Sequence, residues 1–215
     1  NNGQKTIKLV VFLLLSCNTR PHIFSIFKTT HSIMLVKTFG SAVYGVEAIP
    51  ITIEVNWIPS SGKDPTIVGL PDNSVKESLQ RIESTFKTNA YQMPRTKVVV
   101  NLAPADIRKS GTAFDLPIAL GILGASEQID NIDALTNYLI MGELSLNGEI
   151  RPIKGALPIA IHARKEGFKG LIVPKTNARE AGMVNNLQVY GVDHIKEVIE
   201  YFQNDENGLE QVIIN

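Results

Sequence analysis

The segment YLIMGELSLNGEIRPIKGAL, residues 138–157, contains the pattern that decides the fold. Its first part, Tyr138–Leu146, predicts a strand, and Glu149–Ile153 predicts the returning strand. Asn147 and Gly148 between them form the dipeptide preferred in two-residue type I′ turns. A helix is then predicted over Ala156–Glu166. The sequence therefore predicts a β-hairpin that leads directly into a helix.

On both sides of this segment the chain alternates between predicted strands and helices. Alternating apolar and polar residues predict a half-buried strand over Ile49–Trp57, and the β-branched run Lys97–Leu102 predicts a buried one. Ser74 and Glu77 form a capping-box pattern at the start of one helix, and Asp115 is expected to cap another. Further short elements are predicted at Thr66–Val68, Gly170–Val173, Asn177–Met183, Leu187–Tyr190 and His194–Phe202. This mixture of hairpin and crossover units predicts an α+β (mixed α/β) domain with a mixed sheet packed by helices.

The composition is that of an ordinary globular protein. The chain has 215 residues, of which 44% are hydrophobic and 20% charged, and its formal net charge is zero. These values exclude disorder, collagen and coiled coil as descriptions of the whole chain, and they give no overall electrostatic signal for nucleic acid. Cys17 is the single cysteine, so no internal disulfide can form and no cysteine-built metal site is expected.

The first 33 residues differ from the rest. They carry four basic and no acidic residues, and their apolar run at residues 9–15 resembles a secretory signal but is too short for a membrane helix. Residues 14–17, LLSC, resemble a lipobox, which leaves a lipid-anchored envelope protein as an alternative. We predict that residues 1–33 are a spurious or disordered leader and not a working signal, because well-patterned sequence begins at Met34. No cysteine follows Met34, so we expect a cytoplasmic protein without a membrane partner.

The common catalytic and cofactor motifs are missing. The sequence holds no G-x-x-x-x-G-K-[ST], no G-x-G-x-x-G and no H-E-x-x-H pattern. His162 and His194 lie on separate predicted helices without carboxylates at ligand spacing, and the other two histidines lie in the leader. We therefore expect no cofactor or metal site in this chain, and no binding or hydrolysis of ATP by this chain alone.

Two loops carry candidate contacts for a ligand. Residues 107–115 form a basic, glycine-containing loop that leads into a helix N-terminus, where Arg108, Lys109 and Gly111 could contact an anion or DNA. Lys154, in the hairpin segment, is a further candidate contact. The alternative interpretation of the first loop is a solvated turn in front of a helix.

Six segments together resemble a known family. They are residues 34–38, 69–78, 101–106, 111–120, 142–144 and 170–174. Over residues 34–203 the chain is similar to the N-terminal domain of the ComM/YifB family, the magnesium-chelatase-like AAA+ ATPases. The resemblance implies a fold similar to the proteolytic domain of Lon proteases and to the second domain of a small-subunit ribosomal protein. It also implies an AAA+ module beyond Asn215, with residues 204–215 as the linker towards it.

The resemblance further implies what the longer protein does. Members of the family are expected to form a hexameric motor that uses ATP and magnesium and acts on DNA, as a branch-migrating helicase in natural transformation. Within such a protein, this chain is expected to be a non-catalytic accessory domain that serves subunit assembly or the handling of DNA at the ring.

The similarity to Lon proteases also permits a test for catalysis. Lon-type peptidases use a serine that a desolvated lysine activates. By resemblance, the serine position falls on Ala113 and the lysine position on Leu157, and neither side chain can do this chemistry. A Lon-type serine–lysine peptidase is therefore the disfavoured alternative. We expect Ala113 and Leu157 to meet across a shallow apolar pocket, and Ser110, Thr112 and Lys154 to point elsewhere.

Overall fold

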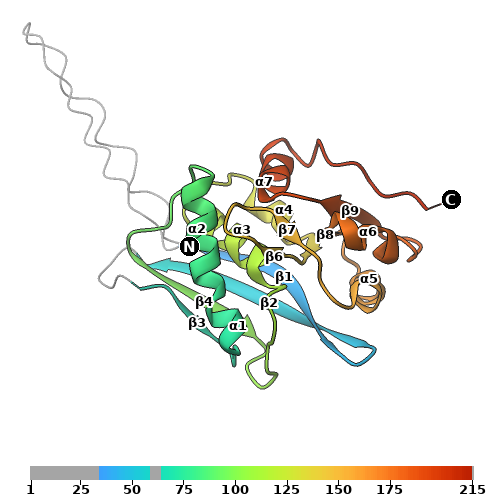
Figure 1. Cartoon of the computed structure of the whole chain (residues 1–215), viewed down its shortest axis with the longest axis horizontal. Coiled ribbons are helices and arrows are strands. Elements are labelled where there is room, and N and C mark those ends of the chain that lie inside the picture. Colours follow the sequence, from blue (N-terminus) through green and yellow to red (C-terminus); the bar gives the residue numbers. More distant parts are fainter. Residues whose placement is uncertain (1–33, 59–63, 215) are drawn as a thin grey trace, which may run out of the picture. The chain divides into compact units, whose positions relative to one another are not determined.

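The computed structural model describes residues 34–58 and 64–214, so the expected leader and its Cys17 lie outside the described residues. Seven strands of the described part form one mixed sheet in the order β3-β4-β2-β1-β5-β8-β9 (Figure 1). Two shorter strands pair with each other in a separate hairpin. This mixed sheet, packed by helices, confirms the predicted fold class. The strands are β1 (Met34–Tyr44), β2 (Glu47–Ile58), β3 (Thr66–Val68), β4 (Lys97–Ala103), β5 (Tyr138–Ile140), β6 (Glu143–Leu144), β7 (Ile150–Arg151), β8 (Gly170–Pro174) and β9 (Gln188–Val192).

One half of the main sheet is largely antiparallel and buries one face. β1 pairs antiparallel with β2, and β2 pairs antiparallel with β4. Along β2 the buried residues alternate, and Ile51, Ile53 and Val55 have no exposed surface, as the sequence predicts. β4 alternates in the same way. The prediction of a strand buried throughout is therefore wrong for Lys97–Leu102, because only every second residue of β4 faces the core.

The other half of the sheet is parallel and buried on both faces. β1, β5, β8 and β9 pair in parallel. Every residue of β5 and β8 is buried, as expected for parallel strands with helices on both sides. The helices around this half are α4 (Ile132–Leu135), α5 (Ala156–Lys165), α6 (Lys175–Ala181) and α7 (Ile195–Gln203).

Helix α3 (Asp115–Ala125) lies at the centre of the domain. It packs against β1 and β2, and α2 (Ser78–Thr88) packs against α3. All eleven residues of α3 are buried, which fits a helix that is apolar on nearly every side. Asp115 does not cap this helix, because Phe114 is the N-cap and Asp115 lies in the first turn. Its predicted capping role is therefore wrong, and its actual role is to pair with α2.

A short helix, α1 (Asn73–Lys76), precedes α2. The carboxylate of Asp72 accepts a hydrogen bond from the Val75 N–H at 2.8 Å, so Asp72 is the N-cap of α1. The predicted capping box of Ser74 and Glu77 is therefore wrong, although the helical spacing of the apolar residues that follow is confirmed. Asp72, one residue before the helix, provides the side-chain acceptor that the first N–H groups of the helix require.

The hairpin at residues 143–151 has shorter strands and a longer loop than the sequence predicts. β5 ends at Ile140, and the chain leaves the main sheet before β6 begins. The Ser145 N–H donates to the Glu149 carbonyl at 2.9 Å, and the Gly148 N–H donates to the Ser145 carbonyl at 3.1 Å. Gly148 has a φ of 96°. This is a three-residue loop with a bulge at the glycine, so the predicted two-residue type I′ turn is wrong.

The segment after α7, expected to be a linker, contacts the domain. The Val212 N–H donates to the Val189 carbonyl at 2.8 Å, and Gln211 forms an antiparallel bridge with Tyr190. Residues 211–212 therefore lie along the outer edge of β9. A module that follows this segment stays a prediction.

Substituting Glu206→Gln in this segment is expected to cost about 1–2 kcal/mol of stability at neutral pH and little in acid. Burial raises the pKa of Glu206, but hydrogen bonds from Lys169 and Tyr138 outweigh it and leave the pKa below its ordinary value of 4.5. A carboxyl whose pKa is lowered by folding stabilises the fold above its unfolded pKa. This contribution is lost as the pH falls through the folded pKa.

Urea unfolding of both proteins, near neutral pH and well below pH 4.5, measures this difference. Glu210→Gln is the matched control, because Glu210 is exposed on the same segment. A Glu206→Gln deficit of the same size in acid would contradict the stated cause.

Candidate functional site

A cavity of about 410 Å³ opens where β1 ends, beside the loop that precedes α3. Its walls come from parts of the chain that are far apart in sequence. They include Ser41–Tyr44 of β1, Ser110–Phe114, Met141, Lys154 and Ile159 of α5. The two loops that the sequence singles out therefore meet at one site.

The two positions that correspond to the Lon dyad are placed differently. Ala113 lines the cavity, whereas Leu157 is not part of its lining. Leu157 lies in the first turn of α5, is half-buried against the core, and donates its backbone N–H to Glu180 Oε1 at 3.0 Å. The prediction that Ala113 and Leu157 meet across a pocket is therefore wrong, because only Ala113 borders the cavity. Neither side chain is a nucleophile or a base.

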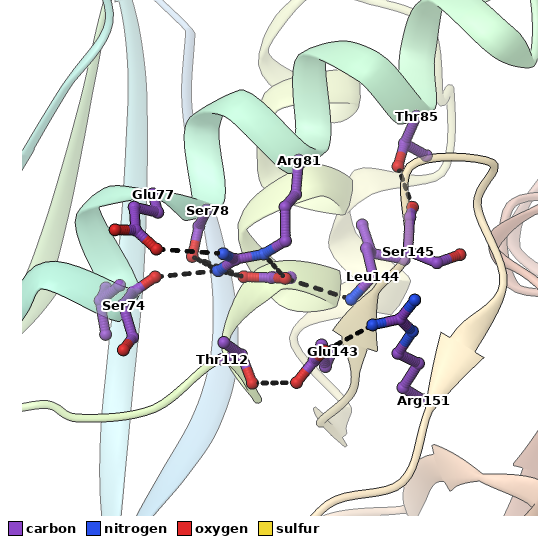
Figure 2. A network of polar contacts seen from close by, with 12 residues as sticks. Ser74, Glu77, Ser78, Arg81, Thr85, Thr112, Glu143, Leu144, Ser145 and Arg151 are labelled. Atoms are coloured by element: carbon purple, nitrogen blue, oxygen red, sulfur yellow. Dashed lines mark hydrogen bonds and ion pairs between the residues drawn. The ribbon is translucent and has the colours of Figure 1, made fainter.

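Three residues next to these positions, each with a hydroxyl or amine side chain, also line the cavity. They are Ser110, Thr112 and Lys154, so the prediction that they lie away from this site is wrong. The Thr112 hydroxyl donates to the carboxylate of Glu143, which also pairs with Arg151 at 3.5 Å (Figure 2). Glu143 thus orients this hydroxyl, and the arrangement is not a Lon-type serine–lysine pair.

Two N–H donors around the start of α3, those of Gly111 and Leu116, already have protein acceptors. The Gly111 N–H donates to Asp72 Oδ2 at 3.2 Å. The Leu116 N–H donates to the Gly142 carbonyl at 3.0 Å. These bonds tie the loop to α1 and to the segment between β5 and β6, and in this structure they leave neither donor for a bound anion.

Lys109 and Arg108 lie in different surroundings. Lys109 is fully buried, and its ammonium donates to the carbonyl of Gly69 at 2.9 Å and to that of Pro104. Burial lowers the pKa of Lys109. Its side chain joins two loops inside the protein instead of facing a ligand. Arg108 is exposed, as is Lys154, so these two remain the accessible candidates for contact with an anion or DNA.

A buried polar network joins α2, α3 and β6 beside the cavity (Figure 2). The fully buried Asp115 carboxylate accepts two hydrogen bonds from Arg81, at 2.6 and 2.9 Å. It also accepts one from the Ser78 hydroxyl at 2.5 Å and one from the Leu144 N–H at 3.1 Å. Burial raises the pKa of Asp115, and these hydrogen bonds oppose the rise. The network fixes the β6–β7 hairpin to the first turn of α3.

Sequence spacing does not reveal this network. Arg81 and Asp115 are 34 residues apart and lie on different helices, so no local spacing connects them. A charged residue at the very start of the apolar helix α3 is the one available clue, because a buried carboxylate requires a partner.

Metal binding and membrane insertion find no support in the described residues. Within residues 34–58 and 64–214, no group of three or more His, Cys, Asp or Glu side chains is placed to hold a metal. In the same part of the chain, every helix is too short or too polar to cross a membrane. Nδ1 of His194 accepts the Lys196 N–H at 3.1 Å and caps α7, while His162 is half-buried on α5.

Comparison with known proteins identifies the family. Residues 53–177 match the family model described as subunit ChlI of Mg-chelatase, and the chain belongs to this family. It is 41% identical over 162 residues to the uncharacterized protein YifB of Escherichia coli (strain K12), and 39% identical over 173 residues to the competence protein ComM of Haemophilus influenzae. These matches cover 75% and 80% of this chain but 31% and 33% of the relatives, so the chain spans about a third of their length.

A weaker likeness connects the chain to Lon proteases. The archaeal Lon protease of Thermococcus kodakarensis is 25% identical over 170 residues, which cover 75% of this chain and 26% of that protein. Together with the mixed sheet, these comparisons confirm the resemblance to the ComM/YifB family and the Lon-like fold.

Proposed function

We propose that this chain is a non-catalytic accessory domain of a ComM-like AAA+ ATPase that processes DNA. The observation that carries the proposal is the 39% identity of this chain to a competence protein. In this chain, the two positions that correspond to the Lon dyad hold Ala113 and Leu157. The competence protein is about three times as long as the matched part, which leaves room for further modules. The scaffold is thus retained while the groups for peptide hydrolysis are replaced.

The whole protein's activity follows from the family resemblance. In this proposal the longer protein is a cytoplasmic hexamer that uses ATP and magnesium to move branched DNA during natural transformation. The domain described here contributes to subunit assembly or guides DNA at the ring. The exposed Arg108 and Lys154 are the residues of the predicted set that such DNA could reach.

A domain exchange in Haemophilus influenzae tests the proposal. The matching segment of the competence protein ComM is replaced by residues 34–212 of this chain, and transformation frequency is compared with that of the parent and of a strain lacking ComM. We expect the chimera to transform at a frequency nearer to the parent than to the deletion strain.

Two matched chimeras control for folding. Asp115→Ala removes the buried network and is expected to abolish the rescue, whereas Glu77→Ala removes only an exposed partner of the same arginine and should keep it. A chimera that accumulates, assembles and hydrolyses ATP like the parent, but transforms no better than the deletion strain, would contradict the proposal.

A further inference from the structure

Three exposed basic side chains lie around the loop that connects β4 to α3. A second surface pocket, of about 340 Å³, lies at this loop and is lined by Arg108 and by Lys76 of α1. Lys154 lines the cavity described above, which borders the next residues of the same loop. All three side chains are exposed, and within residues 34–58 and 64–214 none of them forms an ion pair. Their charges are therefore open to an anionic ligand.

Tyr44, the last residue of β1, connects the two pockets. Its hydroxyl donates a hydrogen bond to the backbone carbonyl of Arg108, and the residue lines the same cavity as Lys154. The hydrogen bond holds the tip of the side chain in place. Because Tyr44 is 46% exposed, much of its ring still faces solvent. An exposed aromatic ring among cations is a platform on which a nucleic-acid base can stack.

The backbone beneath these side chains is fixed. The Lys109 N–H donates to the Leu70 carbonyl at 3.1 Å, and the Asp72 N–H donates to the Lys109 carbonyl at 2.9 Å. Asp72 is the one acidic residue that lines the second pocket, and its two carboxylate oxygens accept the N–H groups of Val75 and Gly111. The carboxylate thus joins the two loops, and the cations are presented by a backbone that is already ordered. Such preorganisation lowers the entropic cost of binding.

We propose that this basic strip, defined by Lys76, Arg108, Tyr44 and Lys154, binds single-stranded DNA. The three cations contact phosphate groups, and one base stacks on the ring of Tyr44. Duplex DNA fits less well, because its bases are stacked on one another and offer the ring no face. An acidic peptide would leave the ring without a stacking partner. The inference rests on the DNA-processing role proposed above, and it specifies the form of DNA that this domain holds.

Titration with two oligonucleotides tests the stacking part of the proposal. The probes are octathymidylate and an abasic octamer with the same number of phosphates, each added to the isotope-labelled full chain and followed through its backbone amide NMR signals. We expect saturable shifts centred on Tyr44 and Arg108. The thymidine probe should bind about five- to a hundredfold more tightly than the abasic one, because only its bases can stack. Tyr44→Ala should remove this difference, whereas Tyr44→Phe, which retains the ring, should keep most of it.

The salt dependence of the affinity tests the cations. Each of the variants Lys76→Gln, Arg108→Gln and Lys154→Gln should weaken binding of octathymidylate about two- to fivefold at low salt. Each should also reduce the slope of log affinity against log salt by about 0.7, the contribution of one phosphate contact with a single strand. Lys165→Gln is the matched control, because Lys165 is an exposed lysine on α5 outside both pocket linings. Every variant keeps the basic residues 1–33, so their contribution cancels in the comparison.

Three results would overturn the inference. They are an absence of saturable shifts at the strip, an unchanged preference for the thymidine probe in Tyr44→Ala, and equal effects of Lys165→Gln and the strip variants. Tighter binding of hexaglutamate at the same residues would assign the strip to an acidic peptide instead.

These outcomes are distinguishable from a failure of the proposed function. If the chimera described above restores transformation but the chain does not bind the oligonucleotide at the strip, only the present inference is wrong. If the chain binds the oligonucleotide as predicted but the chimera does not restore transformation, only the proposed function is wrong.

Discussion

Asp115→Ala is expected to lower the free energy of unfolding by about 3–5 kcal/mol. The substitution removes a carboxylate that accepts four hydrogen bonds, two of them from Arg81. Arg81 is 18% exposed, so its charge would remain largely buried with only the long contact to the exposed Glu77 as an ion pair. The Ser78 hydroxyl and the Leu144 N–H would lose their acceptor as well.

Urea unfolding with an unchanged m-value measures this loss. Glu77→Ala is the control, because Glu77 pairs with the same Arg81 at 3.8 Å but is 63% exposed. We expect this control to cost less than about 1 kcal/mol. Similar losses in the two variants would show that burial of the Asp115 pair does not stabilise the fold as described.

Gly69→Ala is expected to destabilise the domain by about 3–5 kcal/mol. Gly69 has a φ of 97°, and a Cβ there would lie 2.1 Å from the carbonyl oxygen of Leu102. That oxygen belongs to the backbone of β4, so it cannot move aside without disturbing the sheet. The Gly69 carbonyl also accepts a hydrogen bond from the ammonium of Lys109. A shift of the loop that contains Gly69 would strain this buried contact.

Gly111→Ala separates the effect of backbone strain from the effect of the steric contact with Leu102. Gly111 has a similar φ of 88°, but a Cβ there would have no neighbour within 4 Å. It should therefore cost only the backbone strain, about 1–2 kcal/mol. Thermal or urea unfolding compares the two variants, and equal losses would mean that the contact with Leu102 relaxes freely.

The long periodic segments of the fold are predictable from the sequence. Alternation over Ile49–Trp57 and the helical spacing of Val75, Ile82 and Phe86 reflect burial on one face. Such burial can be predicted because the buried positions hold apolar residues and the others polar ones. The errors fall where two local patterns compete. The choice between Asp72 and Ser74 as a cap, and between two loop lengths at Gly148, depends on contacts with distant parts of the chain.

The candidate site is less predictable than the fold. The resemblance to Lon proteases places Ala113 beside the cavity, but the lining by Lys154 and Thr112 depends on the path of the hairpin. Lys109 reads as a surface cation from its neighbours in sequence, yet the carbonyls of Gly69 and Pro104 enclose it. Such reversals arise because long-range packing, which no local spacing encodes, decides which side chains face water.

The segment after α7 also protects the sheet from self-association. β9 is an outer strand, and its backbone groups would offer other chains an edge on which to pair and aggregate. Gln211 and Val212 occupy that edge through Tyr190 and Val189, while the opposite outer strand, β3, is only three residues long. A version of the domain that ends directly after α7 would therefore expose the outer edge of β9 to pairing with other chains. A fragment that is meant to stay monomeric must extend at least to Val212.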